Sequence, residues 1–201
     1  MPLAGLTAYQ ALFTKAGRTF TGDNLGDLKQ GHKVLIIGGA TLVGSYAIQL
    51  AKNVGAYVAC TSSTKPNPAG VPKAEACKAL GADKVIDYTT AEWSDVLAGQ
   101  DYDMIFDTVG SQDDWKNAAK VLKKGCDFIS VANFGPDATA NETNVFKNFL
   151  LKSNTADLND LVRMVSDGKL KVPIDSVVPM SDVPAALTKS LSSANAGKII
   201  I

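Results

Sequence analysis

Residues 34–52, with the sequence VLIIGGATLVGSYAIQLAK, decide how the rest of this chain is interpreted. The apolar run 34–37 predicts a buried parallel strand, and a glycine-containing turn follows it directly. Apolar residues then recur at helical spacing: Val43, Ala47, Ile48 and Ala51. Because a strand, a glycine turn and a helix in this order present backbone N–H groups to a phosphate, the stretch predicts a dinucleotide-binding site.

The composition favours a compact domain with a small-molecule ligand. The chain has 201 residues, 46% of them hydrophobic, which is enough to bury a sizeable core. Its 20 basic and 20 acidic residues cancel, so no net charge favours nucleic acid or an anionic membrane as a partner. No apolar run reaches the roughly 18 residues of a membrane span, and the N-terminus does not resemble a signal peptide. We therefore expect a cytoplasmic protein.

The cysteines and the single histidine argue against a disulfide framework and against a metal site. Cys60, Cys77 and Cys126 are widely spaced and odd in number, which predicts reduced and mostly packed thiols. His32 precedes the first predicted strand and has no partner at the spacing of a zinc site. We expect no metal ligands here and interpret His32 as an exposed turn residue.

Strand-like runs alternate with helical stretches along the chain. Strands are predicted at 34–37, 57–61, 84–87, 104–107 and 128–131, and helices begin near residues 43, 72, 90, 111 and 157. The alternation predicts an α/β fold, a Rossmann-type doubly wound parallel sheet with helices on both faces, followed by a C-terminal helix-strand return segment. We expect a nucleotide-binding domain with a leading helix at 1–152 and the C-terminal segment at 153–201.

The segment 145–152 is predicted to be an edge strand. Its apolar residues alternate in part with lysines, as in edge strands that are protected from uncontrolled pairing. An edge can also pair with a second copy of the chain. We therefore expect a homodimer through the edge strand near Phe146 to Leu151.

The glycine turn departs from a complete G-x-G-x-x-G pattern. Gly39 and Gly44 occupy the first and last glycine positions, which permit the tight turn and close packing of helix on strand. Thr41 stands at the middle position, where the backbone normally approaches the pyrophosphate. A β-branched residue adds bulk and restricts φ, so we expect weakened cofactor binding or a displaced turn.

The end of the second predicted strand favours NADP over NAD. It carries Ser62 and Ser63 and lacks the acidic residue that would accept hydrogen bonds from an unphosphorylated ribose. Two hydroxyls followed by Lys65 and Lys73 suit a 2′-phosphate, which charge-assisted hydrogen bonds would hold. The alternative is that both serines cap a turn and both lysines are solvated.

Several segments together carry a family resemblance. They are LAGLTAY at 3–9, the glycine turn and helix at 38–52, LGADKVIDY at 80–88, IFDTVG at 105–110 and GKIII at 197–201. From Pro2 to the last residue, the chain resembles the medium-chain dehydrogenase/reductase superfamily, specifically its zinc-free quinone oxidoreductase-like branch.

The resemblance implies cofactor-binding positions in several parts of the chain. Thr7 and Tyr9 would lie near the nicotinamide, and Leu42, Val43 and Gly44 would lie at the pyrophosphate. The other implied positions surround the adenosine phosphate (Ser62, Ser63, Lys73, Tyr88) or line the far side (Thr108, Val109, Val131, Ala132, Asn133). Where the family has a glycine pair, this sequence has Thr41-Leu42.

The implied function is an NADPH-dependent oxidoreductase that reduces quinones or α,β-unsaturated carbonyl compounds. Family members begin with a GroES-like barrel of about a hundred residues, which has no counterpart before Met1, so we expect the cofactor-binding portion with one wall of the substrate cleft missing. We therefore assign no catalytic residue and interpret Asp107 as structural. Two alternatives remain: a non-catalytic nucleotide-binding or interaction protein, and a structural relic without a ligand.

Overall fold

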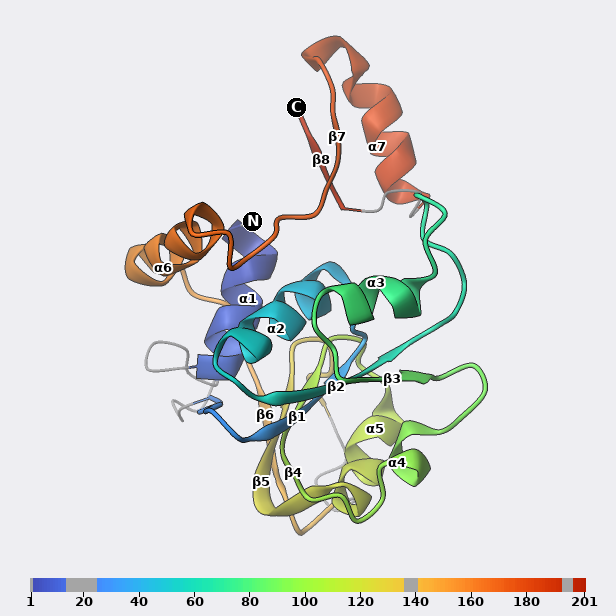
Figure 1. The fold of residues 1–201 in the computed structure, drawn as a ribbon, viewed down its shortest axis with the longest axis vertical. Helices are drawn as coiled ribbons and strands as arrows, with labels where there is room; N and C mark the ends of the chain where they lie inside the picture. Colours follow the sequence, from blue (N-terminus) through green and yellow to red (C-terminus); the bar gives the residue numbers. More distant parts are fainter. Residues whose placement is uncertain (1, 14–24, 136–140, 193–196) are drawn as a thin grey trace.

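The structure, a computed structural model, describes residues 2–13, 25–135, 141–192 and 197–201 (Figure 1). These residues build a sheet of six strands: β1 (Lys33–Ile37), β2 (Tyr57–Ser62), β3 (Lys84–Asp87), β4 (Tyr102–Asp107), β5 (Leu122–Ser130) and β6 (Val145–Asn148). The order is β3-β2-β1-β4-β5-β6, and all neighbouring pairs are parallel. This is the Rossmann strand order, so the predicted α/β doubly wound sheet is confirmed.

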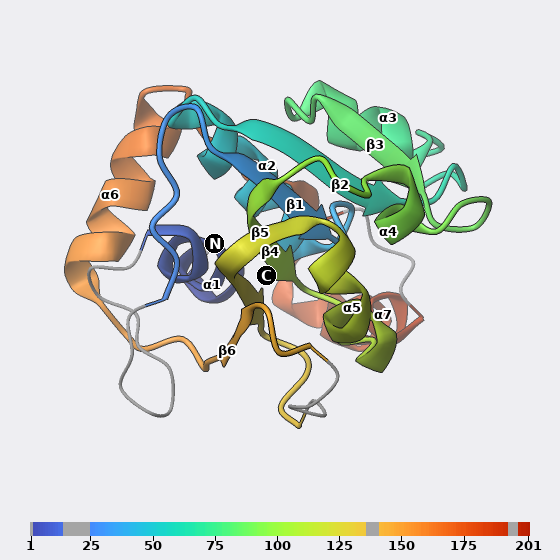
Figure 2. The ribbon, with the colours of Figure 1, turned by 90° about the horizontal axis from the view of Figure 1, so that it is seen from below.

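Helices cover both faces of this sheet. On one face lie α1 (Pro2–Phe13), α2 (Leu42–Asn53), α3 (Lys73–Ala79) and α6 (Thr155–Ser166), and on the other lie α4 (Trp93–Val96), α5 (Gln112–Asn117) and the short helix η1 (Ala118–Lys120), as Figures 1 and 2 show. No helix of the described residues is long and apolar enough to cross a membrane.

The alternation of side chains along β1 produces two cores. Val34 and Ile36 belong to the core under α1 and α2, whereas Leu35 and Ile37 belong to the core under α4 and α5. This follows from the period of two along a strand, and it explains why the whole run is apolar: both faces of the strand are buried.

Two predicted boundaries are wrong, each for a local reason. The helix expected near residue 90 begins at Trp93, because the Asp87 carboxylate accepts a hydrogen bond from Thr89 N (2.9 Å) and holds the preceding residues in a turn. Strand β5 begins at Leu122, before the predicted start at residue 128. Its first half carries the exposed Lys123 and Lys124, which do not show the apolar pattern of a buried strand.

The C-terminal part contains β7 (Ile174–Val177), η3 (Met180–Asp182), α7 (Val183–Leu191) and β8 (Lys198–Ile200). Strands β7 and β8 pair in parallel and, with α7, lie beyond the layer of α1 and α2 in Figure 1. This is the predicted helix-strand return segment. Helix α6 instead joins the main body, where Gln10 Nε2 donates to Asp157 Oδ2 (3.0 Å); the domain boundary after residue 152 stays a prediction.

Strand β6 forms the edge of the six-stranded sheet, as predicted for this segment. Lys147 on β6 forms an ion pair with Asp127 of β5 at 2.8 Å. The lysine therefore stabilises the pairing of the edge strand with its neighbour. Whether a second chain pairs with β6 stays a prediction.

Candidate functional site

The turn between β1 and α2 depends on three glycines with different roles. Gly38 has a φ of +85°, and a Cβ there would lie 2.6 Å from Thr108 Oγ1. A Cβ on Gly44 would lie 2.2 Å from Gly38 O, so only glycine lets α2 approach the strand this closely. A Cβ on Gly39 would lie 2.7 Å from Cys60 Sγ. The positive φ of this turn therefore lies at Gly38, whereas Gly39 permits the close contact with β2.

Thr41 fits this turn without strain. It is the N-cap of α2, with φ at −69°, and its Oγ1 accepts a hydrogen bond from Gly44 N (2.9 Å). The same Oγ1 lies 3.0 Å from Thr108 Oγ1, which in turn donates to Ile37 O at 2.8 Å. The threonine thus ties the turn to the end of β4, and the expectation of weakened cofactor binding or a displaced turn stays a prediction.

The first turn of α2 leaves two backbone N–H groups for a ligand. Gly44 N donates to the Thr41 side chain and Ser45 N donates to Thr41 O. Within the described residues, no protein group accepts a hydrogen bond from the N–H of Leu42 or Val43. Since these groups lie at the positive end of a 12-residue helix, they suit a phosphate.

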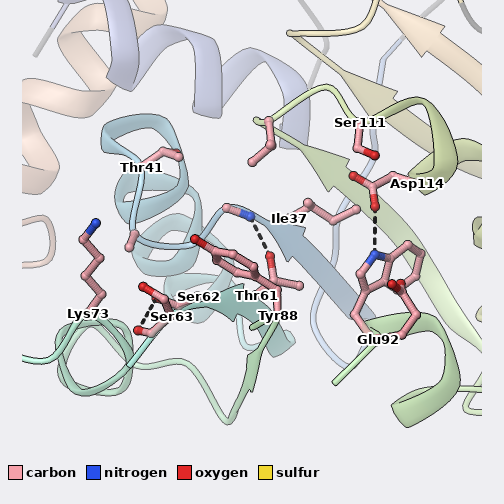
Figure 3. Close-up of a pocket in the computed structure, with 14 residues that line it drawn as sticks. Ile37, Thr41, Thr61, Ser62, Ser63, Lys73, Tyr88, Glu92, Ser111 and Asp114 are labelled. Carbon is pink, nitrogen blue, oxygen red and sulfur yellow. Dashed lines mark hydrogen bonds between the residues drawn. The ribbon is translucent and has the colours of Figure 1, made fainter. Parts of the chain in front are cut away.

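A cavity of about 470 Å³ lies beside this turn, outside the carboxyl ends of the parallel strands (Figure 3). This is where Rossmann-type sheets bind their ligands. The predicted positions that line it are Thr41, Ser62, Ser63, Lys73, Tyr88 and Val109. The lining residues that the sequence did not predict as ligand contacts include Ile37, Thr61, Glu92, Trp93, Ser111 and Asp114.

One end of the cavity is rich in hydroxyl groups and carries a positive charge. Ser62 and Ser63 are buried at the end of β2, and Ser62 Oγ donates to Ser63 O (3.3 Å). Lys73 is half-buried, lines the cavity and forms no ion pair with any described residue. Lys65 is exposed and lies outside the lining. Of the two predicted lysines, the structure therefore brings only Lys73 to the serines.

The other end carries a buried acid. Asp114 is only 8% exposed, and its Oδ1 accepts a hydrogen bond from the indole Nε1 of Trp93 at 2.8 Å. Burial raises the pKa of Asp114 to about 6; the indole hydrogen bond opposes this shift, and the carboxylates of Asp107, Glu92 and Asp113 add to it. A buried, partly protonated acid in a cavity wall is typical of a functional position.

Asp107 is a structural residue, as the sequence indicated. Its carboxylate is fully buried and accepts from Val109 N (2.9 Å), Gly110 N (3.0 Å) and Ser130 Oγ (2.7 Å). Ser130 Oγ also accepts from Asn133 N at 2.9 Å. These bonds join the loops that follow β4 and β5, and they occupy both oxygens of the acid.

Asn133 presents a buried donor without a protein partner. Its Oδ1 accepts from Gly135 N (3.1 Å) and Gln112 Nε2 (3.3 Å), whereas its Nδ2 has no hydrogen bond within the described part of the chain. An unsatisfied buried donor costs free energy. A ligand acceptor beside the loop after β5 would remove this cost. Val131 and Ala132 precede Asn133 in the same loop.

The two predicted nicotinamide contacts have partners inside the protein. Thr7 Oγ1 donates to Leu3 O (2.8 Å), and the Tyr9 hydroxyl donates to Asp160 Oδ2 of α6 (3.1 Å). Burial and then the contact with Asp160 raise the pKa of Tyr9 to about 12. Neither residue lines the cavity, so their role at the nicotinamide stays a prediction.

Comparisons with known proteins place this fold and site in a family. A family model described as "Zinc-binding dehydrogenase" matches residues 80–201. The chain is 30% identical over 213 residues to a chloroplast envelope quinone oxidoreductase homolog of Arabidopsis thaliana, covering 100% of this chain and 60% of that relative. It is 32% identical over 179 residues to an NADPH-dependent alkenal/one oxidoreductase of the same plant, covering 87% and 42%. The chain belongs to the zinc-binding dehydrogenase family.

Within the medium-chain dehydrogenase/reductase superfamily, the chain falls in the quinone oxidoreductase-like branch. The solved structure of the quinone oxidoreductase from Coxiella burnetii superposes with a TM-score of 0.77 at 29% identity, covering 99% of this chain and 58% of that one. The chain spans about half the length of the curated relatives it matches. In the described residues, no group of three or more His, Cys, Asp or Glu side chains could hold a metal ion.

Proposed function

We propose that this chain forms the NADPH-binding portion of an oxidoreductase that reduces quinones or enones. The observation that carries the proposal is the end of β2, where two buried serines and Lys73, which forms no ion pair with a described residue, line the cavity wall. Hydroxyl donors and a lysine suit a 2′-phosphate, and strand β2 (Tyr57–Ser62) itself ends without a carboxylate that would bind an unphosphorylated ribose. The names of the quinone oxidoreductase and NADPH-dependent relatives support the same assignment.

The residues of the turn and of the far loop would hold the rest of the cofactor. The free N–H groups of Leu42 and Val43 would bind the pyrophosphate, and Asn133 Nδ2 would donate to a ligand acceptor. The bound cofactor would supply hydride transfer. The protein groups would bind and orient it and exclude water, and a small-molecule quinone or enone would be the partner of the whole protein.

A parallel titration with NADPH and NADH tests this proposal. Nicotinamide fluorescence and the shift in melting temperature report the binding. We expect saturable binding that favours NADPH by at least about tenfold, the value of one charge-assisted hydrogen bond or more. Equal affinities would contradict the phosphate role of the serines and Lys73. Absence of binding by both would instead favour the non-catalytic interaction protein.

We also propose a cytoplasmic location. The cysteines Cys60, Cys77 and Cys126 are free thiols in the structure, and free thiols are typical of a reducing compartment. Fractionation of the source cells with an antibody against this chain would test the location, and enrichment in a membrane or organelle fraction would contradict it.

A homodimer through β6 is a further part of the proposal. Val145 in β6 and Leu150, two residues after that strand ends, are 44% and 61% exposed, and a second copy could cover them. Light scattering should give twice the chain mass of 21.1 kDa. Leu150→Asp should shift the chain towards the monomer, whereas a monomeric wild type at high concentration would contradict the dimer.

A further inference from the structure

We propose that Asp114 selects adenine as the base of the bound dinucleotide by accepting a hydrogen bond from the exocyclic amino group. The inference rests on the proposed function, since it concerns the same cavity. It concerns the end opposite Lys73: Figure 3 shows Lys73 and the serines on one side of the cavity and Asp114 on the other.

The position of Asp114 is fixed by its neighbour. Trp93 Nε1 donates to Asp114 Oδ1 at 2.8 Å, and both side chains are more than nine-tenths buried. The bond links α4 to α5 across 21 residues of sequence. One carboxylate oxygen is therefore held by the protein, and the orientation of the second oxygen is set by the first.

The second oxygen, Oδ2, has no hydrogen-bond partner among the described residues, although Asp114 lines the cavity. A purely structural contact with Trp93 needs only one acceptor, which an asparagine would supply without the cost of burying a charge. The carboxylate therefore leaves one strong acceptor directed at the cavity contents. A ligand donor is the group that would satisfy it.

The surroundings of Asp114 suit an aromatic base. Ile37, Trp93 and Val109 line the cavity with apolar surface, against which a flat ring can pack. Adenine offers an amino donor at its 6-position, whereas hypoxanthine and guanine carry a carbonyl oxygen there. An ionised Asp114 attracts the amino group of adenine and repels the carbonyl oxygen of hypoxanthine or guanine. The site therefore distinguishes these bases by the group at their 6-position.

The direct test compares the binding of NADPH with that of its hypoxanthine analogue, reduced nicotinamide hypoxanthine dinucleotide phosphate, by calorimetry. We expect wild type to bind the adenine form at least about tenfold more tightly. In Asp114→Asn the acceptor that faces the cavity can become an amide donor, so the preference should disappear or reverse. Asp113→Asn is the matched control, because it removes the same charge from the exposed neighbouring position, and it should keep the wild-type preference.

A pH series on the wild type provides a second measurement that does not depend on a variant folding. Burial raises the pKa of Asp114, and the carboxylates of Asp107 on β4, Glu92 before α4 and Asp113 on α5 raise it further. The adenine preference should therefore weaken as the pH falls below about 6 and Asp114 becomes protonated. A preference that stays constant with pH would contradict the inference.

The outcomes separate the two proposals. If NADPH binds more tightly than NADH but the adenine and hypoxanthine forms bind equally, the role of Asp114 is overturned and the proposed function stands. If the preference survives in a folded Asp114→Asn protein, Asp114 is again overturned. If no dinucleotide binds, both proposals fail.

Discussion

The two ends of the cavity are assembled in different ways. At the proposed phosphate end, Ser62 ends β2, Ser63 follows it directly, and Lys73 begins the next helix. At the base end, Trp93 and Asp114 belong to different helices and meet only because the sheet brings α4 and α5 together. Local sequence therefore encodes the first end, and tertiary structure creates the second.

The ends also differ in their electrostatics. Lys73 is half-exposed, so its charge is partly solvated and its attraction for a phosphate is screened by salt. Asp114 is buried, so its interactions are less screened and its protonation is sensitive to its neighbours. We expect the phosphate end to contribute a salt-dependent affinity and the base end a pH-dependent selectivity. The following changes separate these contributions, in order of decreasing effect.

Gly44→Asp should remove binding at both ends at once. The new Cβ would lie 2.2 Å from Gly38 O, and the carboxylate would repel the pyrophosphate. We expect no measurable binding of NADPH or NADH by fluorescence titration. Ala119→Asp is the control for the added charge, because Ala119 is exposed and does not line the cavity. Wild-type affinity in a folded Gly44→Asp protein would show that the turn does not bind the pyrophosphate.

Lys73→Glu should affect the phosphate end alone. Lys73 is the only cationic side chain among the described residues that line the cavity. Reversing its charge should weaken NADPH binding by about 30-fold or more, since a charged hydrogen bond is lost and a repulsion is added. The affinity for NADH should change less than about threefold, near the limit of a distant surface charge. Lys65→Glu at the exposed position is the control. An equal loss for both cofactors would contradict the comparison.

Asp114→Asn should change stability in a pH-dependent manner. The pKa of Asp114 is raised from 3.8 to about 6 in the folded protein, so the folded state binds more protons than the unfolded state between these values. The wild type therefore loses stability as the pH rises through this range, and the variant does not. We expect the free energy of unfolding of the variant, relative to wild type, to rise by about 2 kcal/mol from about pH 4 to about pH 7.

Urea unfolding at the two pH values measures this difference. Asp113→Asn, at the exposed neighbouring position, should show much less change. If both variants respond alike, the effect comes from the net charge of the helix and burial of Asp114 does not cause it.

Thr41→Val should have the smallest effect. The substitution keeps the shape but removes the hydroxyl that caps α2 and contacts Thr108. We expect a loss of about 1 kcal/mol in the free energy of unfolding and little change in the relative affinity for NADPH and NADH. Thr41→Ser retains the hydroxyl and should stay close to wild type. A larger loss of binding than of stability would show that the hydroxyl contacts the ligand.

The sequence predicts the sheet well because the strands are apolar on both faces and each is followed by a turn of its own. It also predicts that Ser62 and Ser63 lie beside the cavity, since any Rossmann fold directs this strand end to its ligand. It misses Asp114, because an aspartate in the first turn of a polar helix looks like an ordinary solvated residue. Its burial depends on Trp93, whose indole reaches it from another element.

The glycine turn shows what the spacing of glycines does not resolve. Gly38 and Gly39 are adjacent, and the spacing to Gly44 alone favoured Gly39 as the turn residue. Only the backbone angles distinguish them, since Gly38 has the positive φ. Thr41 was expected to disturb the turn, yet its hydroxyl replaces a missing intrahelical acceptor, which is an ordinary N-cap role.

The sparse packing of the C-terminal unit has a consequence for hydrogen exchange. Of the described residues in α7, only Ala186 is buried, and Leu191 at its end is 86% exposed. Val177, at the end of β7, is 73% exposed. Because few apolar contacts oppose its opening, the amides of β7 and β8 should exchange through local unfolding far faster than those of the buried strand β1. Slower hydrogen exchange of the β7 and β8 amides on mixing with another protein would therefore report directly that the exposed surface of β7, α7 and β8 has been covered.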